Sequence, residues 1–320
     1  MEYQKENEMS KIAFVFPGQG AQYIGMAQDF YNTMPECKET FDKATELLGF
    51  DMAELCFEEN ERLDKTEYTQ AAILTATIAI LKAVGKTGIK ADITAGLSLG
   101  EYCALVANSA LSFEDAVQLV RKRGIFMEHE VPDGKGTMAA ILGLQSDVIE
   151  NICNEIQKEQ GNPVQPANYN CPGQIVISGE KNAVLAAGEK LKEAGARRVV
   201  ELKVSGPFHS DMLKGAGEKL AGELKNVTFS DMSIPYVTNV TASILDKETT
   251  AEQIKELLKV QVSSAVKWQQ SIENMINSGV DTFIEIGPGR TLSGFIRKID
   301  RTKKVLNIEK IEDLEKLKEL

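Results

Sequence analysis

Residues 92–102, DITAGLSLGEY, contain a run of small and β-branched residues that ends in Gly-Leu-Ser-Leu-Gly. The run predicts a short buried strand, and residues 101–108 after it predict the start of a helix. A G-x-S-x-G motif between a strand and a helix is typical of a nucleophile elbow, in which the two glycines remove Cβ atoms that would collide in a strained turn. Ser98 then presents its hydroxyl at the N-terminus of the helix, where backbone amides can bind developing negative charge. The alternative is a Gly/Ser turn without chemistry, and the pentapeptide alone does not decide between the two.

The composition is that of a folded globular protein. The chain has 320 residues, of which 43% are hydrophobic and 26% charged, so we expect one large domain or a domain with an insert. A net charge of −11 argues against a nucleic-acid-binding surface, which requires concentrated positive charge. The five cysteines include no C-x-x-C pair, so we predict neither a disulfide framework nor a metal site, and a cytoplasmic location.

Two segments bear on targeting. Residues 1–10 are polar and lack an apolar core behind a basic start, so we interpret them as a polar extension and not a secretion signal. The longest apolar stretch, 71–81, is well short of the ~20 residues that span a bilayer. We therefore interpret it as part of a buried helix and expect no membrane association.

The apolar runs predict an α/β fold with an inserted second sheet. The strand 11–16 ends in Pro-Gly-Gln-Gly, which places Gln19 at the carboxyl end of a strand, where ligands bind in open α/β sheets. Farther along, strands and helices follow in the order β-α-β-β-α-β, the ferredoxin-like pattern. We therefore predict an α/β-hydrolase-like large subdomain at 11–133 and 206–320 and a ferredoxin-like small subdomain at 134–205.

The individual elements follow from periodicity and turn residues. The insert is expected to have strands at 137–143, 164–168, 174–178 and 197–204, helices at 145–160 and 180–194, and a turn at 170–173. Elsewhere we expect helices at 32–48, 68–84, 112–127, 211–224, 251–258 and 263–277, and strands at 235–239 and 281–286. The tail has an apolar residue at every third position from 308 to 320, which predicts a narrow stripe that packs back on the body.

The chain contains only two histidines, and a serine nucleophile needs a base. His129 lies between two glutamates at the end of a predicted helix and is interpreted as a surface residue. His209 follows a Gly-Pro turn and precedes a helix start, which makes it the candidate base. No acid between Ser98 and His209 stands out in a strand-end loop, so a dyad oriented by a backbone carbonyl and a Ser-acid-His triad both remain open. Arg123 either offers a planar fork to a substrate carboxylate or is a solvated cation.

Six sequence blocks, in order along most of the chain, resemble the malonyl-CoA:acyl carrier protein transacylases of type II fatty acid synthesis. They are Phe16–Gln22 (FPGQGAQ), Gly96–Tyr102 (GLSLGEY), Arg123-Gly124, Asn168–Gly179 (NYNCPGQIVISG), Gly206–Ser210 (GPFHS) and Glu285–Gly289 (EIGPG).

The resemblance implies a role for each matching residue. Ser98 is the residue that becomes acylated, His209 is its base, and Arg123 binds the malonyl carboxylate. The backbone amides of Gln19 and Leu99 form the oxyanion hole.

The resemblance also implies that the carbonyl of Gln261 orients the histidine, because Gln261 shortly precedes the block Ala265–Trp268 (AVKW). Three positions depart from the family pattern. Leu97 stands where histidine is usual, Ala265 replaces a proline, and Ala21 replaces a frequent serine.

The implied activity is transfer of a malonyl group from malonyl-CoA to the phosphopantetheine thiol of acyl carrier protein, by a ping-pong mechanism through a malonyl-serine. It requires no cofactor, since malonyl-CoA is a substrate, and we expect a cytoplasmic monomer. Two alternatives remain: a trans-acting polyketide acyltransferase, which uses the same chemistry, and a serine (thio)esterase.

Overall fold

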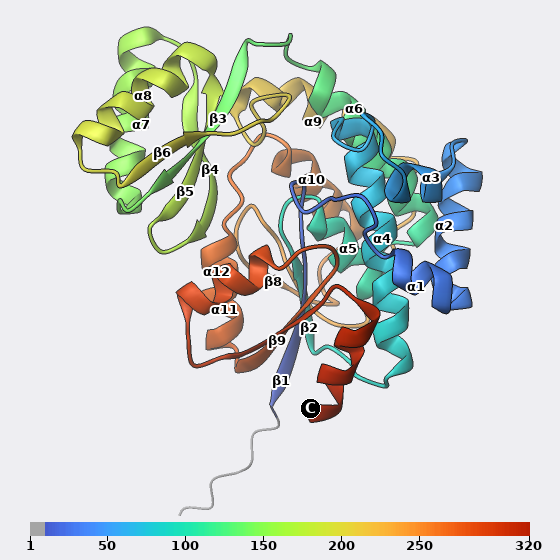
Figure 1. Cartoon of the computed structure of the whole chain (residues 1–320). Coiled ribbons are helices and arrows are strands. Elements are labelled where there is room, and N and C mark those ends of the chain that lie inside the picture. Colours follow the sequence, from blue (N-terminus) through green and yellow to red (C-terminus); the bar gives the residue numbers. More distant parts are fainter. Residues whose placement is uncertain (1–9) are drawn as a thin grey trace, which may run out of the picture.

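Two β-sheets organise the chain, and a computed structural model describes residues 10–320 (Figure 1). The expected polar extension at 1–10 lies outside these residues apart from Ser10. The strands are β1 Lys11–Phe16, β2 Ile93–Gly96, β3 Gly136–Leu142, β4 Val164–Cys171, β5 Gln174–Glu180, β6 Arg198–Glu201, β7 Tyr236–Val237, β8 Ile244–Leu245, β9 Val280–Ile286 and β10 Lys304–Ile308. The α-helices are α1 Gln28–Thr33, α2 Pro35–Leu48, α3 Met52–Phe57, α4 Thr66–Lys86, α5 Gly100–Ala107, α6 Phe113–His129, α7 Ser146–Gln160, α8 Lys181–Glu193, α9 Lys214–Leu224, α10 Ala251–Gln261, α11 Trp268–Asn277 and α12 Thr291–Ile299, with 3₁₀ helices at Asp211–Leu213 and Ile311–Glu319.

The larger sheet has the strand order β10-β9-β1-β2-β7-β8 and is parallel except for the pair β7 and β8. Along β1, Phe14 and Phe16 belong to one apolar cluster, with α2, α4 and α6, while Ala13 and Val15 belong to another, with α11 and α12. Figure 1 shows these two groups of helices on opposite sides of the sheet. Because both faces of β1 are covered, its sequence is apolar from Ile12 to Phe16.

The smaller sheet is antiparallel, with the order β4-β5-β3-β6, and α7 and α8 cover one face of it. This confirms the predicted β-α-β-β-α-β order and the ferredoxin-like pattern. The strand β4 is longer than predicted, because it continues to Cys171, and the turn before β5 is restricted to Pro172 and Gly173.

Two predicted helices are wrong in their bounds. The helix expected at 32–48 is interrupted at Met34, because Pro35 lacks an amide hydrogen and disfavours helical geometry in the preceding residue. The helix expected at 263–277 begins only at Trp268. The residues before it are a turn at 262–264 and then Val266, which pairs with β4: its amide donates to the Ala167 carbonyl (2.8 Å) and its carbonyl accepts from the Tyr169 amide (2.9 Å). The next residue, Lys267, donates its amide to the carbonyl of Asn239, just beyond β7 of the larger sheet (2.9 Å), so this segment connects the two sheets.

The apolar stripe predicted for the tail packs back on the body as expected, and it is formed by the end of β10 and the 3₁₀ helix after it. A spacing of three matches the 3.0 residues per turn of a 3₁₀ helix better than the 3.6 of an α-helix. Ile308 and Leu317 are buried, as expected, whereas Leu320 is exposed. The sequence analysis missed β8 and β10, both of which are short.

The helix α4 has 21 residues and is apolar enough to cross a membrane, but most of its length is buried in the fold. This is the expected buried helix, extended at both ends. The first turn of α4 lies beside the candidate site, because Thr66 is hydrogen-bonded to Gln19. The loop between α3 and α4 therefore helps to position the site.

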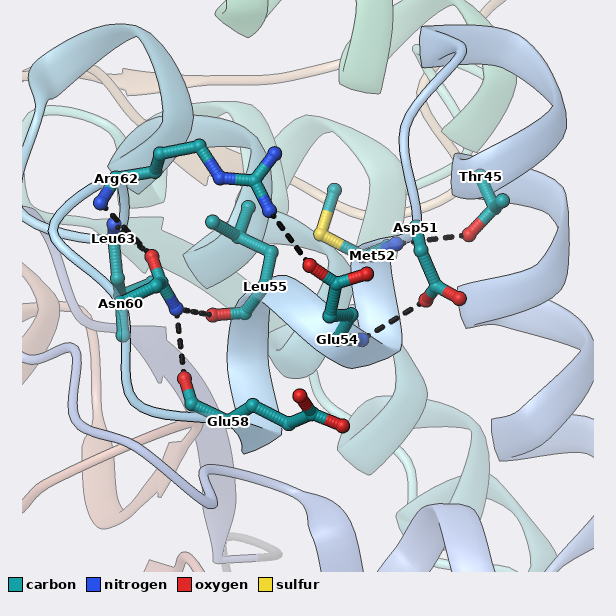
Figure 2. Close-up of polar contacts among 9 residues, drawn as sticks. All are labelled: Thr45, Asp51, Met52, Glu54, Leu55, Glu58, Asn60, Arg62 and Leu63. Atoms are coloured by element: carbon teal, nitrogen blue, oxygen red, sulfur yellow. Dashed lines mark hydrogen bonds and ion pairs between the residues drawn. The ribbon is translucent and has the colours of Figure 1, made fainter.

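Asn60 organises that loop with four hydrogen bonds (Figure 2). Its side-chain amide donates to the carbonyls of Leu55 (2.9 Å) and Glu58 (2.8 Å). Its side-chain oxygen accepts from the amides of Arg62 and Leu63, both at 2.9 Å. One side chain thus satisfies backbone groups on both sides of the turn.

The turn between β2 and α5 packs without space for Cβ atoms. A Cβ on Gly96 would lie 1.9 Å from the carbonyl carbon of Gly100, and one on Gly100 would lie 2.2 Å from the Phe16 carbonyl oxygen. Both contacts are with backbone, which cannot rotate away as a side chain can.

We predict that Gly96→Ala and Gly100→Ala each lower the free energy of unfolding by roughly 3 kcal/mol or more, because the backbone must shift to relieve the overlap. Gly85→Ala is the matched control: nothing lies within 4 Å of its Cβ, and alanine in α4 should raise stability by about 0.5–1 kcal/mol. Urea denaturation measures both effects. Similar stabilities for the three variants would contradict the prediction.

Candidate active site

Ser98 lies in the turn between β2 and α5 with φ at 53°, the left-handed region that non-glycine residues rarely adopt. Hydrogen bonds hold its backbone on both sides. Its amide donates to the Asn239 Oδ1 (2.6 Å), and its carbonyl accepts from the Gln261 Nε2 (2.9 Å). The predicted strand-turn-helix context of the G-x-S-x-G motif is therefore present.

The structure brings His209 to Ser98, although 111 positions separate them. The Ser98 Oγ lies 2.7 Å from the His209 Nε2. On the other side of the ring, Nδ1 lies 2.9 Å from the Gln261 carbonyl and 3.1 Å from the Ser264 carbonyl. Because a carbonyl only accepts, Nδ1 carries the proton and Nε2 is left to accept from the serine hydroxyl.

Of the two arrangements left open by the sequence, the geometry is that of a dyad. Among residues 10–320, Nδ1 has these two carbonyls as its partners and no carboxylate. The carbonyl of Gln261 belongs to the last turn of α10, where carbonyls have no intrahelical partner, and besides His209 it accepts only the Ser264 amide (3.3 Å) among the described residues. Burial of the ring, which is 3% exposed, lowers the pKa of His209 to about 4, and the nearby positive charge of Arg123 contributes to the shift.

Arg123 is buried, with 1% of its surface exposed, so the solvated alternative is wrong. One terminal nitrogen donates to the Gln70 Oε1 (2.7 Å), and the other donates to the Gln261 Oε1 (3.0 Å) and the Ser98 Oγ (3.1 Å). Among residues 10–320 its hydrogen-bond partners are neutral, so a cationic fork lies beside the serine hydroxyl with no carboxylate of this part of the chain bound to it. His129, by contrast, is exposed at the end of α6, as predicted.

The two residues expected to supply oxyanion amides flank the serine. Leu99 follows it as the N-cap of α5. Gln19 lies in the loop after β1, which touches the elbow: a Cβ on Gly18 would lie 2.5 Å from the Leu97 carbonyl oxygen. The Gln19 side chain donates to the Thr66 Oγ1 at the start of α4 (3.1 Å), which fixes the loop.

A cavity of about 600 Å³ opens over the serine, between the two sheets. Gln19, Ser98 and His209 line it from one side, and apolar side chains of β3 and β5, Met138 and Val176, line it from the other. The described part of the chain has no group of three or more His, Cys, Asp and Glu side chains arranged to hold a metal ion.

Four further polar residues hold the site and were missed from the sequence: Gln70, Glu101, Asn239 and Ser264. Asn239 had a usable signal, because it ends a predicted strand of the large sheet, at the edge where ligands bind. Gln70 is a polar residue within an apolar helix. In the sequence Glu101 has only the pattern of an acidic residue in a first helical turn, and Ser264 lies in a stretch predicted to be helical, although α11 begins at Trp268.

Comparison with known proteins identifies the family. Residues 13–317 match the family model described as "Acyl transferase domain". Malonyl CoA-acyl carrier protein transacylase of Bacillus subtilis is 48% identical over 308 residues, with 96% of each chain covered. The protein of the same name from Staphylococcus aureus is 46% identical over 307 residues, covering 96% of this chain and 98% of the relative.

Solved structures agree along nearly the whole chain. The crystal structure of malonyl CoA-acyl carrier protein transacylase from Clostridium perfringens matches with a TM-score of 0.92 and 46% identity, covering 97% of this chain and 96% of that one. A malonyl-transacylase in complex with its type II PKS acyl-carrier protein matches with a TM-score of 0.92 and 39% identity, covering 95% and 98%. With the family model and these relatives all spanning both sheets and the serine turn, the chain belongs to the acyl transferase domain family.

Proposed function

We propose that the protein transfers a malonyl group from malonyl-CoA to the phosphopantetheine thiol of acyl carrier protein, through a malonyl ester on Ser98. The observation that carries the proposal is the buried Arg123 guanidinium 3.1 Å from the Ser98 hydroxyl, which is itself 2.7 Å from His209. A serine with a base can take an acyl group. A buried cation next to it selects an acyl group that ends in a carboxylate.

In the first half-reaction, His209 Nε2 takes the hydroxyl proton as Ser98 Oγ bonds to the thioester carbon. The amides of Gln19 and Leu99 stabilise the oxyanion. When the carbon–sulfur bond breaks, the coenzyme A thiolate receives the proton from His209, and the malonyl-serine ester remains.

The second half-reaction runs the same steps in reverse with a different thiol. The phosphopantetheine thiol gives its proton to His209 as its sulfur attacks the ester carbon. The Ser98 oxygen leaves and recovers the proton. The Gln261 carbonyl on Nδ1 belongs to the last residue of α10, where the helix dipole is negative, and together with the Ser264 carbonyl it stabilises the imidazolium formed in each half-reaction.

The proposal includes the predicted division into subdomains at 11–133 with 206–320 and at 134–205. It is supported by the sheets, since β3 to β6 all fall within the second range and the remaining strands within the first. A cytoplasmic monomer that needs no cofactor stays a prediction. A trans-acting polyketide acyltransferase remains the second candidate, favoured by the similarity to the malonyl-transacylase in complex with a type II PKS carrier protein.

We predict that incubation with malonyl-CoA adds one malonyl group to the wild-type chain and none to Ser98→Ala, as measured by intact mass. Addition of carrier protein bearing phosphopantetheine then removes the group. Free malonate released at the same rate without a thiol acceptor would instead indicate a (thio)esterase, and a malonylated Ser98→Ala chain would exclude Ser98 as the nucleophile.

We predict that Arg123→Ala lowers the preference for malonyl-CoA over acetyl-CoA by about 10- to 100-fold, the usual value of a charge-assisted hydrogen bond. The ratio of the two acylation rates measures this. Arg121→Ala, on the same helix but paired with Glu67 outside the cavity, is the control and should leave the ratio unchanged. A retained malonyl preference in Arg123→Ala would contradict a carboxylate clamp.

The lowered pKa of His209 predicts the pH dependence of the reaction. Because the imidazole must be neutral to act as a base, kcat/KM for acylation should stay level from pH 8 down to about 5 and fall only near the pKa of about 4. Acetyl-CoA is the better substrate for this measurement, since it has no carboxyl group of its own to titrate. In Arg123→Ala, which lacks the nearby positive charge, the fall should move to higher pH. A fall in kcat/KM near pH 6.5, the ordinary pKa of histidine, would contradict the buried position of the imidazole.

A further inference from the structure

Glu101 is a buried carboxylate that the proposed mechanism does not use. It lies in the first turn of α5 with none of its surface exposed. Its Oε2 accepts hydrogen bonds from the Gln261 Nε2 (2.7 Å) and from the Asn239 backbone amide (3.2 Å). Burying a carboxylate is costly, so its place needs an explanation beyond packing.

Both of its partners also bind the serine turn. The side chain of Asn239 accepts from the Ser98 amide (2.6 Å) and donates to the Gly96 carbonyl (2.7 Å). The Nε2 of Gln261 donates to the Ser98 carbonyl (2.9 Å). One carboxylate oxygen is thus the common acceptor for the two residues that hold the peptide groups before and after Ser98.

Gln261 can make all of these hydrogen bonds in only one orientation of its side-chain amide. Its Oε1 faces Arg123, which only donates, so Nε2 must face acceptors, and these are the Glu101 Oε2 and the Ser98 carbonyl. The carbonyl of the same residue holds Nδ1 of His209. Fixing Gln261 therefore fixes groups on the nucleophile, the base and the arginine together.

We propose that Glu101 is a positioning residue for acyl transfer: through Asn239 and Gln261, its Oε2 holds Ser98 in the left-handed conformation that directs Oγ at His209. This rests on the proposed function only in taking Ser98 as the residue acylated.

The position of the acceptor, and not its charge, is what the contacts require. The ionisable groups that face Glu101 are Arg123 from α6, Tyr102 from α5 and Tyr236 from β7. The hydroxyls of Thr238 and Tyr236 also face this carboxylate, so its second oxygen, Oε1, lies among groups that can either donate or accept a hydrogen bond. Burial raises the pKa of Glu101 to about 7, and a proton on Oε1 leaves Oε2 free to accept.

Two reciprocal variants test this. Glu101→Gln removes the charge and keeps an oxygen at the same reach, whereas Glu101→Asp keeps the charge and withdraws the oxygen by one carbon–carbon bond. We expect Glu101→Asp to slow the acylation of Ser98 at saturating malonyl-CoA by roughly 10²-fold, as misplaced reacting groups do. Glu101→Gln should slow it by no more than about tenfold, since a neutral oxygen is a weaker acceptor than a carboxylate. The loss should appear in the rate at saturation more than in KM.

The rates should thus rank wild type, then Glu101→Gln, then Glu101→Asp. A Glu101→Gln variant as slow as Glu101→Asp, or a Glu101→Asp variant at the wild-type rate, would overturn the proposal.

Glu285→Asp is the matched control. Glu285 is also a buried carboxylate that accepts two backbone amides, at the start of α12 (3.0 and 2.7 Å), and it makes no hydrogen bond to Ser98, His209 or Gln261. The Glu285→Asp variant should lower Tm without the loss in acylation rate expected for Glu101→Asp. If the wild-type chain itself acquires no malonyl group on Ser98, the proposed function fails, and that result is distinct from any ranking of the variants.

Discussion

Ser98 adopts a left-handed backbone conformation, which costs a non-glycine residue about 1–3 kcal/mol. Two local features offset that cost. The glycines at 96 and 100 let the backbones of β2, α5 and β1 pack in direct contact. Polar side chains bind the peptide groups on both sides of the serine. The rest of the site depends on this turn. The turn fixes the Ser98 hydroxyl, and His209, Arg123 and the loop after β1 are arranged around it.

The other members of the site come from ends of elements, where side chains and backbone groups are not committed to the fold. His209 lies in the loop that returns from the smaller sheet, also with a positive φ of 59°. Gln261 is the last residue of α10, and Asn239 follows β7 at the carboxyl edge of the larger sheet. Arg123 and Gln70 come instead from within helices, and the Arg123 side chain is long enough to reach Ser98 from the middle of α6.

Much of this arrangement follows from local pattern. The sequence predicts a strand that is apolar on both faces, a serine between two glycines and a β-α-β-β-α-β order. It also predicts the pairing of that serine with one of only two histidines. What could not be read were contacts set by long-range packing. Glu101 looks like any acidic residue in a first helical turn until the fold buries it beneath Gln261. The residues just before α11 have a helical composition, but a turn at 262–264 and the pairing of Val266 with β4 keep them out of the helix.

That pairing links the width of the cavity to the orientation of the imidazole. Val266 is hydrogen-bonded to β4 of the smaller sheet, and within five residues of it lie both carbonyls that hold His209. The smaller sheet also forms the far wall of the cavity. Moving that wall outward to admit a bulkier acyl group therefore pulls on the histidine's own supports, so the fold couples the size of the acyl group to the competence of the base.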